Sequence, residues 1–452
     1  MKILVLNGSP KGKYSITLQT ALYLEKKHPE HKFEILNVGS QIRGFEKDFT
    51  AAVEALSNAD LILFSYPVYT FIAPSQLHRF IELMKASGVD FSDKYATQLS
   101  TSKHFYDVTA HKYIQENCQD LGMRFIKGLS ADMDDLLAEK GQREAADFFD
   151  YVCWCVKNNV YEAIPKPLDP AKHMPVAHFE NSTGKPGNVV IVADLNKEDT
   201  QLGNMINRFM AKLPLNSTLI NIAEFPFKGG CLGCFNCAGD GKCIYKDGFD
   251  TLLRENIQTA DAIVIAFSIK DHSMGARFKT YDDRQFCNGH RTVTMGMPFG
   301  YLVSGDYSKE ANLQLIVEGR AEVGGNFLAG VATDEFDPDN EIDKLADRLN
   351  YAIKHKYVQP SNFLGVGGMK IFRDLIWLMQ GMMKADHRFY KAHKQYDFPQ
   401  KKRGTMLKMY LVGALITNPK LKAKLGNKMN EGMIAPYARV IEAAAITEGK
   451  KQ

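Results

Sequence analysis

The chain begins Met1-Lys-Ile-Leu-Val-Leu-Asn-Gly-Ser-Pro-Lys-Gly-Lys-Tyr-Ser-Ile-Thr17, and this stretch sets the expectation for the fold. The apolar run at 3–6 predicts a buried strand, and Asn-Gly-Ser-Pro at 7–10 is a turn signal. A helical pattern of apolar residues starts at 16. Where a strand turns through glycine into a helix, the first N–H groups of the helix are unpaired and favour an anion. The stretch therefore predicts a strand–turn–helix unit with a phosphate-binding turn.

The glycine spacing excludes two common phosphate motifs. Gly-x4-Gly-Lys-Ser/Thr is absent, and Gly8 and Gly12 are not spaced as in Gly-x-Gly-x-x-Gly. The alternative is an ordinary strand–turn–helix whose hydroxyls only cap the helix, and this stretch alone does not decide between the two. The candidate phosphate ligands are hydroxyl donors and cations: Ser9, Ser15, Thr17, Lys11 and Lys13.

Composition indicates a soluble chain of two or three domains. The 452 residues are 45% hydrophobic and 24% charged. No apolar run approaches the roughly 18 residues of a membrane span, and the first one is too short for a signal peptide. We therefore expect a cytoplasmic protein, with its eight cysteines reduced or bound to metal.

Alternating apolar runs and helical patterns predict an α/β fold. Strands are expected at 2–7, 33–38, 61–65, 96–101 and 124–127, and helices at 16–27, 48–58, 75–86, 107–120 and 133–159. Five such units specify a doubly wound parallel sheet covered by helices on both faces. Ligands of such sheets bind at the carboxyl ends of the strands.

The second part of the chain repeats the first. Residues 58–65, Asn-Ala-Asp-Leu-Ile-Leu-Phe-Ser, match residues 259–266, Thr-Ala-Asp-Ala-Ile-Val-Ile-Ala, at an offset of 201. We therefore expect two tandem five-stranded domains, at 1–164 and 187–357, joined by a Pro- and Gly-bearing stretch. The phosphate turn is degenerate in the second copy, because three carboxylates there would repel a phosphate: Asp194, Glu198 and Asp199.

Residues 358–452 are expected to form a basic helical extension. Residues 354–452 hold 19 Lys and Arg against 6 Asp and Glu, a net charge of +13, so residues 1–353 carry −9 of the total of +4. Basic helices with Met and Trp377 suggest peripheral contact with a membrane or a partner groove. The alternative is a helical extension that packs on the two sheets. No nucleic-acid partner is expected.

Two further loops are expected at the same sheet edge as the phosphate turn. Pro67 and Pro74 stiffen the loop after the third strand, where Tyr69 and Phe71 present a flat surface. Hydroxyls at 100–102 follow the fourth strand. A phosphate turn, an aromatic wall and a polar loop at one edge indicate a mononucleotide that carries a planar heterocycle.

These motifs resemble the flavodoxin-like NAD(P)H-dependent FMN reductases, a family that includes the iron–sulfur flavoproteins. The resemblance rests on Gly8-Ser9-Pro10 with Ser15 and Thr17, on Pro67-Val68-Tyr69 with Pro74, and on Ser100-Thr101-Ser102. It implies an FMN phosphate surrounded by Ser9, Lys11, Ser15, Ile16 and Thr17, although the family usually has Arg where Lys11 stands. It implies ring or ribityl contacts from Pro67, Val68, Tyr69, Thr70, Ser100, Thr101 and Ser102.

The resemblance also implies an activity. NAD(P)H would stack on the flavin, which carries the redox chemistry, so no separate catalytic residue is expected. The acceptor would be a quinone-like or other small electrophile, or a partner protein. The alternatives are an electron carrier that serves a dedicated partner reductase, and a non-catalytic protein that docks on a membrane or partner. Family members often pair subunits near the flavin, so a homo-oligomer, or internal pairing of the two copies, is expected.

A second candidate site is the cysteine-rich loop Cys231-Leu-Gly-Cys234-Phe-Asn-Cys237-Ala-Gly-Asp-Gly-Lys-Cys243. Its spacing, C-x2-C-x2-C-x5-C, could hold a [4Fe–4S] cluster, it also suits zinc, and a metal-free loop is the third alternative. It resembles the cluster motif of the iron–sulfur flavoproteins and would suit an electron relay to or from the flavin. No role is expected for Cys153, Cys155, Cys287, His272 or His290, and only local ion pairs for Lys279, Asp282, Asp283 and Arg284.

Overall fold

The computed structural model describes two compact units, Met1–His393 and Lys394–Gln452. Residues 163–172, 177–186, 360–361, 418–419 and 421–452 are excluded from the description. Most of the expected linker between the domains and the end of the expected extension therefore lie outside the described residues. Each unit is considered by itself below.

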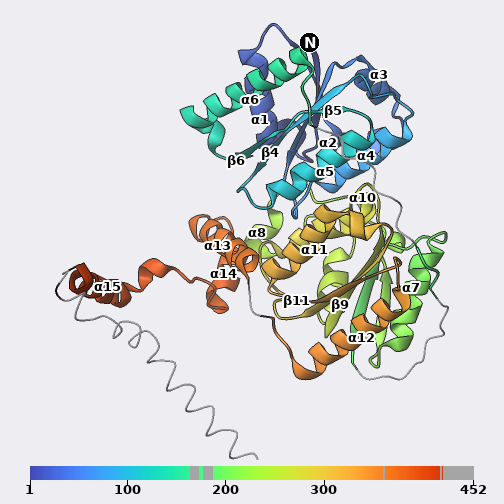
Figure 1. Ribbon diagram of the computed structural model, residues 1–452, viewed down its shortest axis with the longest axis vertical. Coiled ribbons are helices and arrows are strands. Elements are labelled where there is room, and N and C mark those ends of the chain that lie inside the picture. Colours follow the sequence, from blue (N-terminus) through green and yellow to red (C-terminus); the bar gives the residue numbers. More distant parts are fainter. Residues whose placement is uncertain (163–172, 177–186, 360–361, 418–419, 421–452) are drawn as a thin grey trace, which may run out of the picture. The chain divides into compact units, whose positions relative to one another are not determined.

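The first unit opens with a parallel α/β sheet (Figure 1). Its strands are β1 (Lys2–Asn7), β2 (Lys32–Leu36), β3 (Leu61–Pro67), β4 (Tyr95–Ser102), β5 (Arg124–Phe125) and β6 (Leu129–Asp132). The order is β2-β1-β3-β4-β5, and β6 continues beside β4 beyond β5. The sheet thus has six strands where five were expected, because the expected fifth strand is interrupted at residues 126–128 and continues as β6. At Gly128 a Cβ would lie 2.2 Å from Gln98 of β4.

The helices of this domain follow the sequence pattern closely. They are α1 (Ile16–Lys27), α2 (Val38–Phe45), α3 (Thr50–Asn58), α4 (Ser75–Ala86), α5 (Asp107–Asp120) and α6 (Glu139–Asn158). The extra helix is α2, which begins at Val38, where the sequence predicted the end of a strand. Val38 is fully buried, so its apolar side chain serves the core from a helix rather than from a strand.

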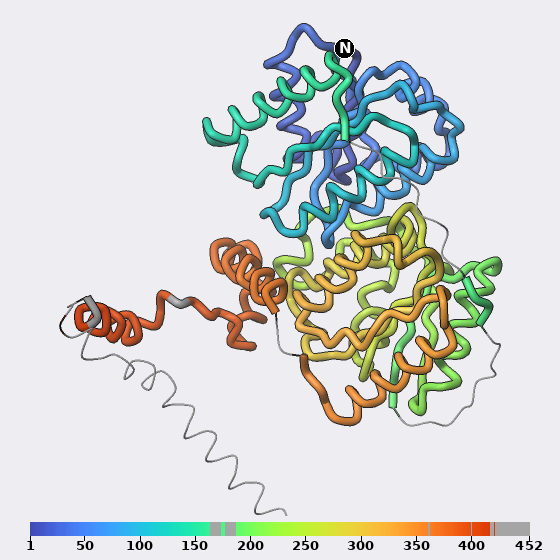
Figure 2. The backbone as a smooth tube through the Cα atoms, in the orientation of Figure 1, coloured from blue at the N-terminus to red at the C-terminus, as the bar shows by residue number. Residues whose placement is uncertain are grey.

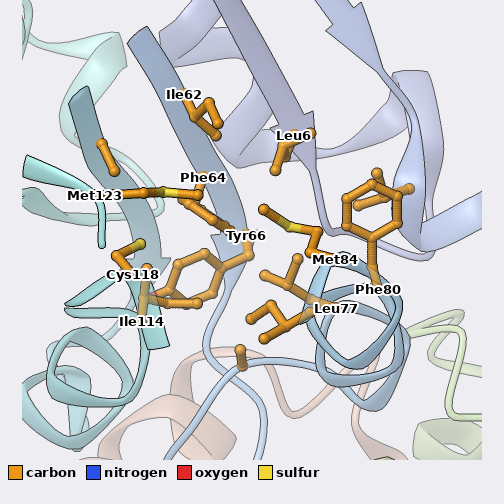
Figure 3. Close-up of a cluster of buried hydrophobic side chains, with 14 of the residues drawn as sticks. Leu6, Ile62, Phe64, Tyr66, Leu77, Phe80, Met84, Ile114, Cys118 and Met123 are labelled. Carbon is orange, nitrogen blue, oxygen red and sulfur yellow. The ribbon is translucent and has the colours of Figure 1, made fainter. Parts of the chain in front are cut away.

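Strand β3 is buried on both faces, which explains its nearly continuous apolar sequence. Ile62, Phe64 and Tyr66 belong to one core cluster, and Leu61 and Leu63 to the cluster on the opposite face. Figure 3 shows the first three converging with side chains of α4 and α5. Burying each such side chain contributes about 1.5–3 kcal/mol, so the core fixes the sheet whose edge carries the loops described below.

The second half of the unit confirms the repeat. Its strands are β7 (Val189–Ala193), β8 (Ser217–Asn221), β9 (Ala262–Ser268), β10 (Pro298–Ser304) and β11 (Phe327–Thr333), in the order β11-β10-β9-β7-β8. Numbered within its own copy, this order equals that of the first sheet. The helices are α7 (Thr200–Lys212), α8 (Asn236–Asp240), α9 (Phe249–Thr251), α10 (Gly275–Arg284), α11 (Ala311–Gly324) and α12 (Pro338–His355). The chain therefore has the flavodoxin-like fold twice in tandem.

The two domains pack through equivalent helices, with α4 on α10 and α5 on α11 (Figure 2). The backbone N–H of Ser75 donates to Asp283 Oδ2 (2.8 Å), and that of Ala276 donates to Glu82 Oε1 (2.9 Å). The two donors, Ser75 and Ala276, are 201 residues apart, and so are the two acceptors, Glu82 and Asp283, which is the repeat offset. Reciprocal contacts of this kind are the signature of a two-fold interface, here within one chain.

The C-terminal helices divide between the units. Helices α13 (Phe363–Leu378) and α14 (Lys384–Ala392) belong to the first unit, where α13 packs on α11 and α14 on α8. In the second unit, α15 (Arg403–Thr417) exposes apolar side chains, including Leu407 and Tyr410. None of the described helices combines the length and the apolar character needed to cross a membrane.

Candidate functional site

A cavity of about 530 Å³ lies where the first sheet's carboxyl edge meets the second domain and helices α13 and α14. Eleven of the twelve predicted FMN residues line it: Ser9, Lys11, Ser15, Ile16, Thr17, Pro67, Val68, Tyr69, Thr70, Thr101 and Ser102. Ser100 is not among the lining residues. Ser100 lies further back along β4 than Thr101 and Ser102, and its hydroxyl is taken up by His111 Nε2 at 2.7 Å.

The phosphate turn is held in shape by Asn7, a residue that the sequence analysis left out. The Asn7 side-chain amide donates to the carbonyl oxygen of Gly12 and to Asn37 Oδ1, both at 2.9 Å. Ser15 caps α1 by accepting from the backbone N–H of Leu18. The other N–H groups of the first helical turn have no intrahelical acceptor, and so suit a phosphate.

The third loop adjoins this turn and offers a free donor. Thr17 Oγ1 and Thr101 Oγ1 lie 2.6 Å apart, which joins the start of α1 to the end of β4. The Ser102 hydroxyl is buried, lines the cavity and has no hydrogen-bond partner within the described part of the chain. A buried hydroxyl costs free energy unless something bonds it, so this edge fits a bound polar group. The turn, the unpartnered hydroxyl and the flat wall together fit FMN.

The loop after β3 adopts a strained backbone. Tyr69 and Ile72 exchange backbone hydrogen bonds at 2.8 and 3.1 Å. Between them, Thr70 (φ 43°) and Phe71 (φ 73°) are left-handed, a conformation that L-residues with a Cβ adopt at a cost of about 1–2 kcal/mol each. Such conformations persist only where the surroundings hold them, and they gather at functional sites.

Helix α10 of the second domain supplies that support. Lys279 Nζ donates to the carbonyl oxygen of Tyr69 (3.1 Å) and to Thr70 Oγ1 (2.7 Å), and Thr70 Oγ1 donates to Asp282 Oδ2 (2.7 Å). Lys279, Asp282 and Asp283 are fully buried. Burial lowers the pKa of Lys279 to about 8, against the opposing effect of Asp283. The expected ion pairs within α10 are therefore present, but they also hold the loop of Tyr69 and Thr70 in the other domain.

Arg284 departs from the expected local pairing. Its guanidinium binds both carboxylate oxygens of Asp247 at 2.8 Å, 37 residues earlier in the chain. Asp247 follows Cys243 by four residues, so Arg284 anchors the chain just after the cysteine-rich loop. No spacing in the sequence indicates this contact.

The cysteine-rich loop of the second domain covers the carboxyl edge of the first sheet. Lys11 Nζ lies 5.0 Å from the centre of the Phe235 ring, and Gln76 Nε2 donates to the carbonyl oxygen of Cys231 at 3.2 Å. At Gly233, φ is +60° and a Cβ would lie 2.0 Å from the Tyr69 hydroxyl, so only glycine fits there. All four cysteines of the motif line the cavity: Cys231, Cys234, Cys237 and Cys243.

The sulfur atoms do not gather as around a single metal ion. Zinc with four sulfur ligands at 2.3 Å would bring those sulfurs to about 3.8 Å from one another. Within the described residues, no three of the four thiols come within 4.8 Å of each other. Burial raises the pKa of Cys231 to about 12 and that of Cys237 to about 11, so both are neutral thiols at pH 7 without a metal. This arrangement does not fit zinc.

His272 is not isolated, contrary to expectation. Nε2 of its ring lies 3.0 Å from Asp120 Oδ2 and Nδ1 lies 3.0 Å from Glu310, so it bridges carboxylates of both domains. Burial opposes its charge, but the two carboxylates outweigh that effect and raise the pKa to about 10. His272, Glu310 and Glu116 converge, but hydrogen bonding of both ring nitrogens already explains the group. The sequence concealed the contact because the partners are 38 and 152 residues away.

Comparisons with known proteins agree with this architecture. Residues 1–134 match a family described by its flavodoxin-like fold. An iron–sulfur flavoprotein of Archaeoglobus fulgidus is 26% identical over 176 residues, covering 36% of this chain and 77% of that protein.

Solved structures resemble the chain over about one domain. An NADH:FMN oxidoreductase in its apo form is 18% identical, covering 36% of this chain and 91% of the other, with a TM-score of 0.30. An NAD(P)H:quinone oxidoreductase from Methanothermobacter marburgensis is 14% identical, covering 36% and 96%, with a TM-score of 0.28.

Proposed function

We propose that this chain, whose first 134 residues belong to a family with the flavodoxin-like fold, is an FMN-dependent NAD(P)H oxidoreductase. The observation that carries the proposal is the convergence of three predicted cofactor loops on one cavity. Its acceptor would be a small electrophilic or quinone-like molecule or a partner protein. Eight free cysteines support a cytoplasmic location.

The residues would divide the work of binding FMN by chemistry. The first turn of α1, with Ser9, Ser15 and Thr17, would bond the phosphate, and Lys11 would add charge. The loop of Tyr69 and its neighbours would border the ring, and the free hydroxyl of Ser102 would bond it or the ribityl chain. Bound FMN would supply the electron transfer between nicotinamide and acceptor.

FMN binding to the purified protein tests this proposal. We expect a yellow protein, or a colourless one that takes up added FMN, and loss of the flavin absorbance under anaerobic NADH or NADPH. The variant S102A tests the unpartnered hydroxyl and should weaken FMN binding about fivefold, since a hydrogen bond contributes about 1 kcal/mol. Failure to bind FMN at all would contradict the proposal.

An electron carrier is the alternative reading of the same site. Flavin that is reduced slowly by NAD(P)H but quickly by a reduced ferredoxin would favour that alternative. Rapid reduction by NADH or NADPH with turnover of a small acceptor would favour the reductase.

We also propose that Cys231, Cys234, Cys237 and Cys243 hold a [4Fe–4S] cluster that relays electrons. The support is their common position on the cavity wall, directly over the candidate flavin loops. Four cysteines on one compact loop are the donor set by which proteins hold such a cluster. Iron and acid-labile sulfide analysis after anaerobic purification tests this: about four of each are expected, and none in C234S with C237S.

A peripheral membrane contact is proposed for the second unit. Helix α15 exposes Leu407, Tyr410 and Leu411 by more than 60% each, and the cations at 401–403 lie at its start in the sequence. Apolar side chains flanked by cations suit an anionic lipid surface. The full chain should sediment with phosphatidylserine vesicles but not with phosphatidylcholine vesicles, and L407E with L411E should abolish that binding.

A further inference from the structure

Six aromatic rings on the wall of the cavity form a continuous chain. The rings follow one another in the order Tyr69, Phe286, His290, Phe372, Phe105 and Phe71. In that order, the distances between neighbouring ring centres are 5.6, 6.4, 5.0, 4.7 and 5.2 Å. All six residues line the cavity. They come from both flavodoxin-like domains and from α13, so the wall exists only when all three are assembled.

Such a wall favours flat apolar ligands. Aromatic rings at these separations offer faces and edges on which a planar molecule gains stacking contacts. His290 is the one member of the six with ring nitrogens, one of which can carry and pass on a proton.

A buried carboxylate holds that imidazole. Asp386 of α14 is fully buried, and its Oδ2 lies 3.4 Å from His290 Nδ1 and 3.2 Å from the backbone nitrogen of His290. Arg291 Nε lies 3.6 Å from Asp386 Oδ1, which has no hydrogen-bond partner within the described residues. The Tyr390 hydroxyl donates to the carbonyl oxygen of His290 at 3.2 Å.

The backbone confirms how closely this pair is fitted. Gly289 has φ +59°, and a Cβ there would lie 2.3 Å from Asp386 Oδ1. A carboxylate placed at Nδ1 fixes the ring orientation and leaves Nε2 as the nitrogen that can exchange a proton. No hydrogen-bond partner of Nε2 occurs in the described part of the chain, and the ring forms part of the cavity wall.

We propose that His290, positioned by Asp386, gives a proton to a planar quinone bound against the aromatic wall, an inference that rests on the proposed function. Reduced FMN, when bound, would supply a hydride, that is two electrons and one proton, and the quinone that takes it would become a hydroquinone anion. The N–H bond at Nε2 of the imidazolium breaks as an O–H bond forms on the anionic oxygen. The neutral imidazole then regains a proton from water, so atoms and charge balance.

The test compares an acceptor that needs a proton with one that does not. FMN-loaded enzyme is reduced by light under anaerobic conditions, so the result does not depend on reduction by NAD(P)H. It is then mixed rapidly with 1,4-benzoquinone or with ferricyanide, which takes single electrons only. General acid catalysis contributes about 10²–10⁴-fold, so H290Q should slow reoxidation by the quinone at least about 100-fold. Reoxidation by ferricyanide should stay within about twofold.

Two further variants separate proton donation from a structural role. H290A should lose the quinone reaction and regain at least about tenfold of it with added imidazole, while D386N should show a smaller loss than H290Q. Equal slowing of both acceptors, or no slowing of the quinone, would overturn the proposal.

A binding measurement on the FMN-free protein gives an independent readout. Calorimetry with 1,4-naphthoquinone should show weaker binding for F372A by about fivefold, the loss of one aromatic contact of about 1 kcal/mol, and a change under threefold for H290Q. Unaltered binding to F372A would remove the aromatic wall as the acceptor site. If NAD(P)H fails to reduce the flavin while the quinone result holds, the reductase proposal fails and the role of His290 stands.

Discussion

The two domains share one backbone design and differ in what their cofactor edges carry. In the first, residues 69–72 form a tight loop with left-handed Thr70 and Phe71, and in the second, residues 270–273 repeat it with left-handed Asp271 and His272. The first edge lines the cavity, whereas the second has Lys270 in place of Tyr69 and Asp194 in place of Gly8. The fold and its strained loop thus persist without the residues that suit a phosphate, so the sheet does not require those side chains.

The largest loss of stability is expected at one of the two reciprocal contacts between the domains. Asp283 pairs with a buried lysine, whereas its counterpart Glu82 pairs with a half-exposed arginine. D283A removes one of the two buried carboxylates that pair with Lys279 and the acceptor of the Ser75 N–H, and breaking this buried pair should cost about 3 kcal/mol although Asp282 remains 3.4 Å from Lys279 Nζ. Its mirror variant E82A removes a partner of half-exposed Arg79 and should cost about 1 kcal/mol. Urea unfolding measures both, and equal losses would contradict the asymmetry.

Exchanging one residue between the two edges should abolish cofactor binding. The backbone nitrogens of Gly8 and Asp194 donate to equivalent strand carbonyls, at 2.8 and 3.0 Å, so the two residues occupy the same place. G8D brings a carboxylate to the phosphate turn and should weaken FMN binding about 100-fold, or about 2.7 kcal/mol. G8A is the control for size: its Cβ would lie 2.7 Å from Cδ2 and 3.1 Å from Cβ of buried Leu77, so Leu77 must shift, and binding should fall at most about tenfold.

A pH dependence should distinguish His272 from its counterpart Phe71. The folded pKa of about 10 exceeds the unfolded value of about 6.5, so the stabilisation is complete below pH 6.5 and is lost as the pH rises toward 10. Part of the side chain is exposed, so we expect the free energy of unfolding to fall by about 2 kcal/mol over that range. In H272F this fall should disappear; if it persists, another group is responsible.

The smallest effect concerns a contact that only the first edge makes with the other domain. Lys11 lies over Phe235 and lines the cavity beside the phosphate turn. K11A removes its charge and should weaken FMN binding about five- to tenfold. K11R should stay within threefold, and F235A should change binding less than K11A. Titration of FMN fluorescence measures all three, and a larger loss in K11R than in K11A would exclude a charge effect.

The sequence predicted what depends on local pattern. The period of apolar residues gave β1, α1, α4 and α5 to the residue, and the repeat offset predicted the second sheet. Eleven of the twelve FMN residues reach the cavity because strand ends at one sheet edge are neighbours by topology. Ser100 does not line the cavity, because it lies further back along β4 and its hydroxyl bonds His111, a partner that no local pattern indicates.

The remainder was hidden because it depends on contacts distant in the sequence. Lys279 meets Thr70 across 209 residues, and His290 meets Asp386 across 96, and no local pattern marks either pair. The strained loop gave no signal either, since Thr70 and Phe71 are unremarkable in composition. Only docking of the domains and of α14 brings these residues together.

Covalent linkage of the paired domains has a consequence for concentration and for evolution. A site shared between separate subunits falls apart on dilution, whereas here the second half arrives at an effective concentration set by the tether. Lys279 and the cysteine-rich loop should therefore stay on the Tyr69 loop in a single molecule at vanishing protein levels. Each half can also mutate without imposing the same change on the other, which a symmetric dimer of identical chains cannot do.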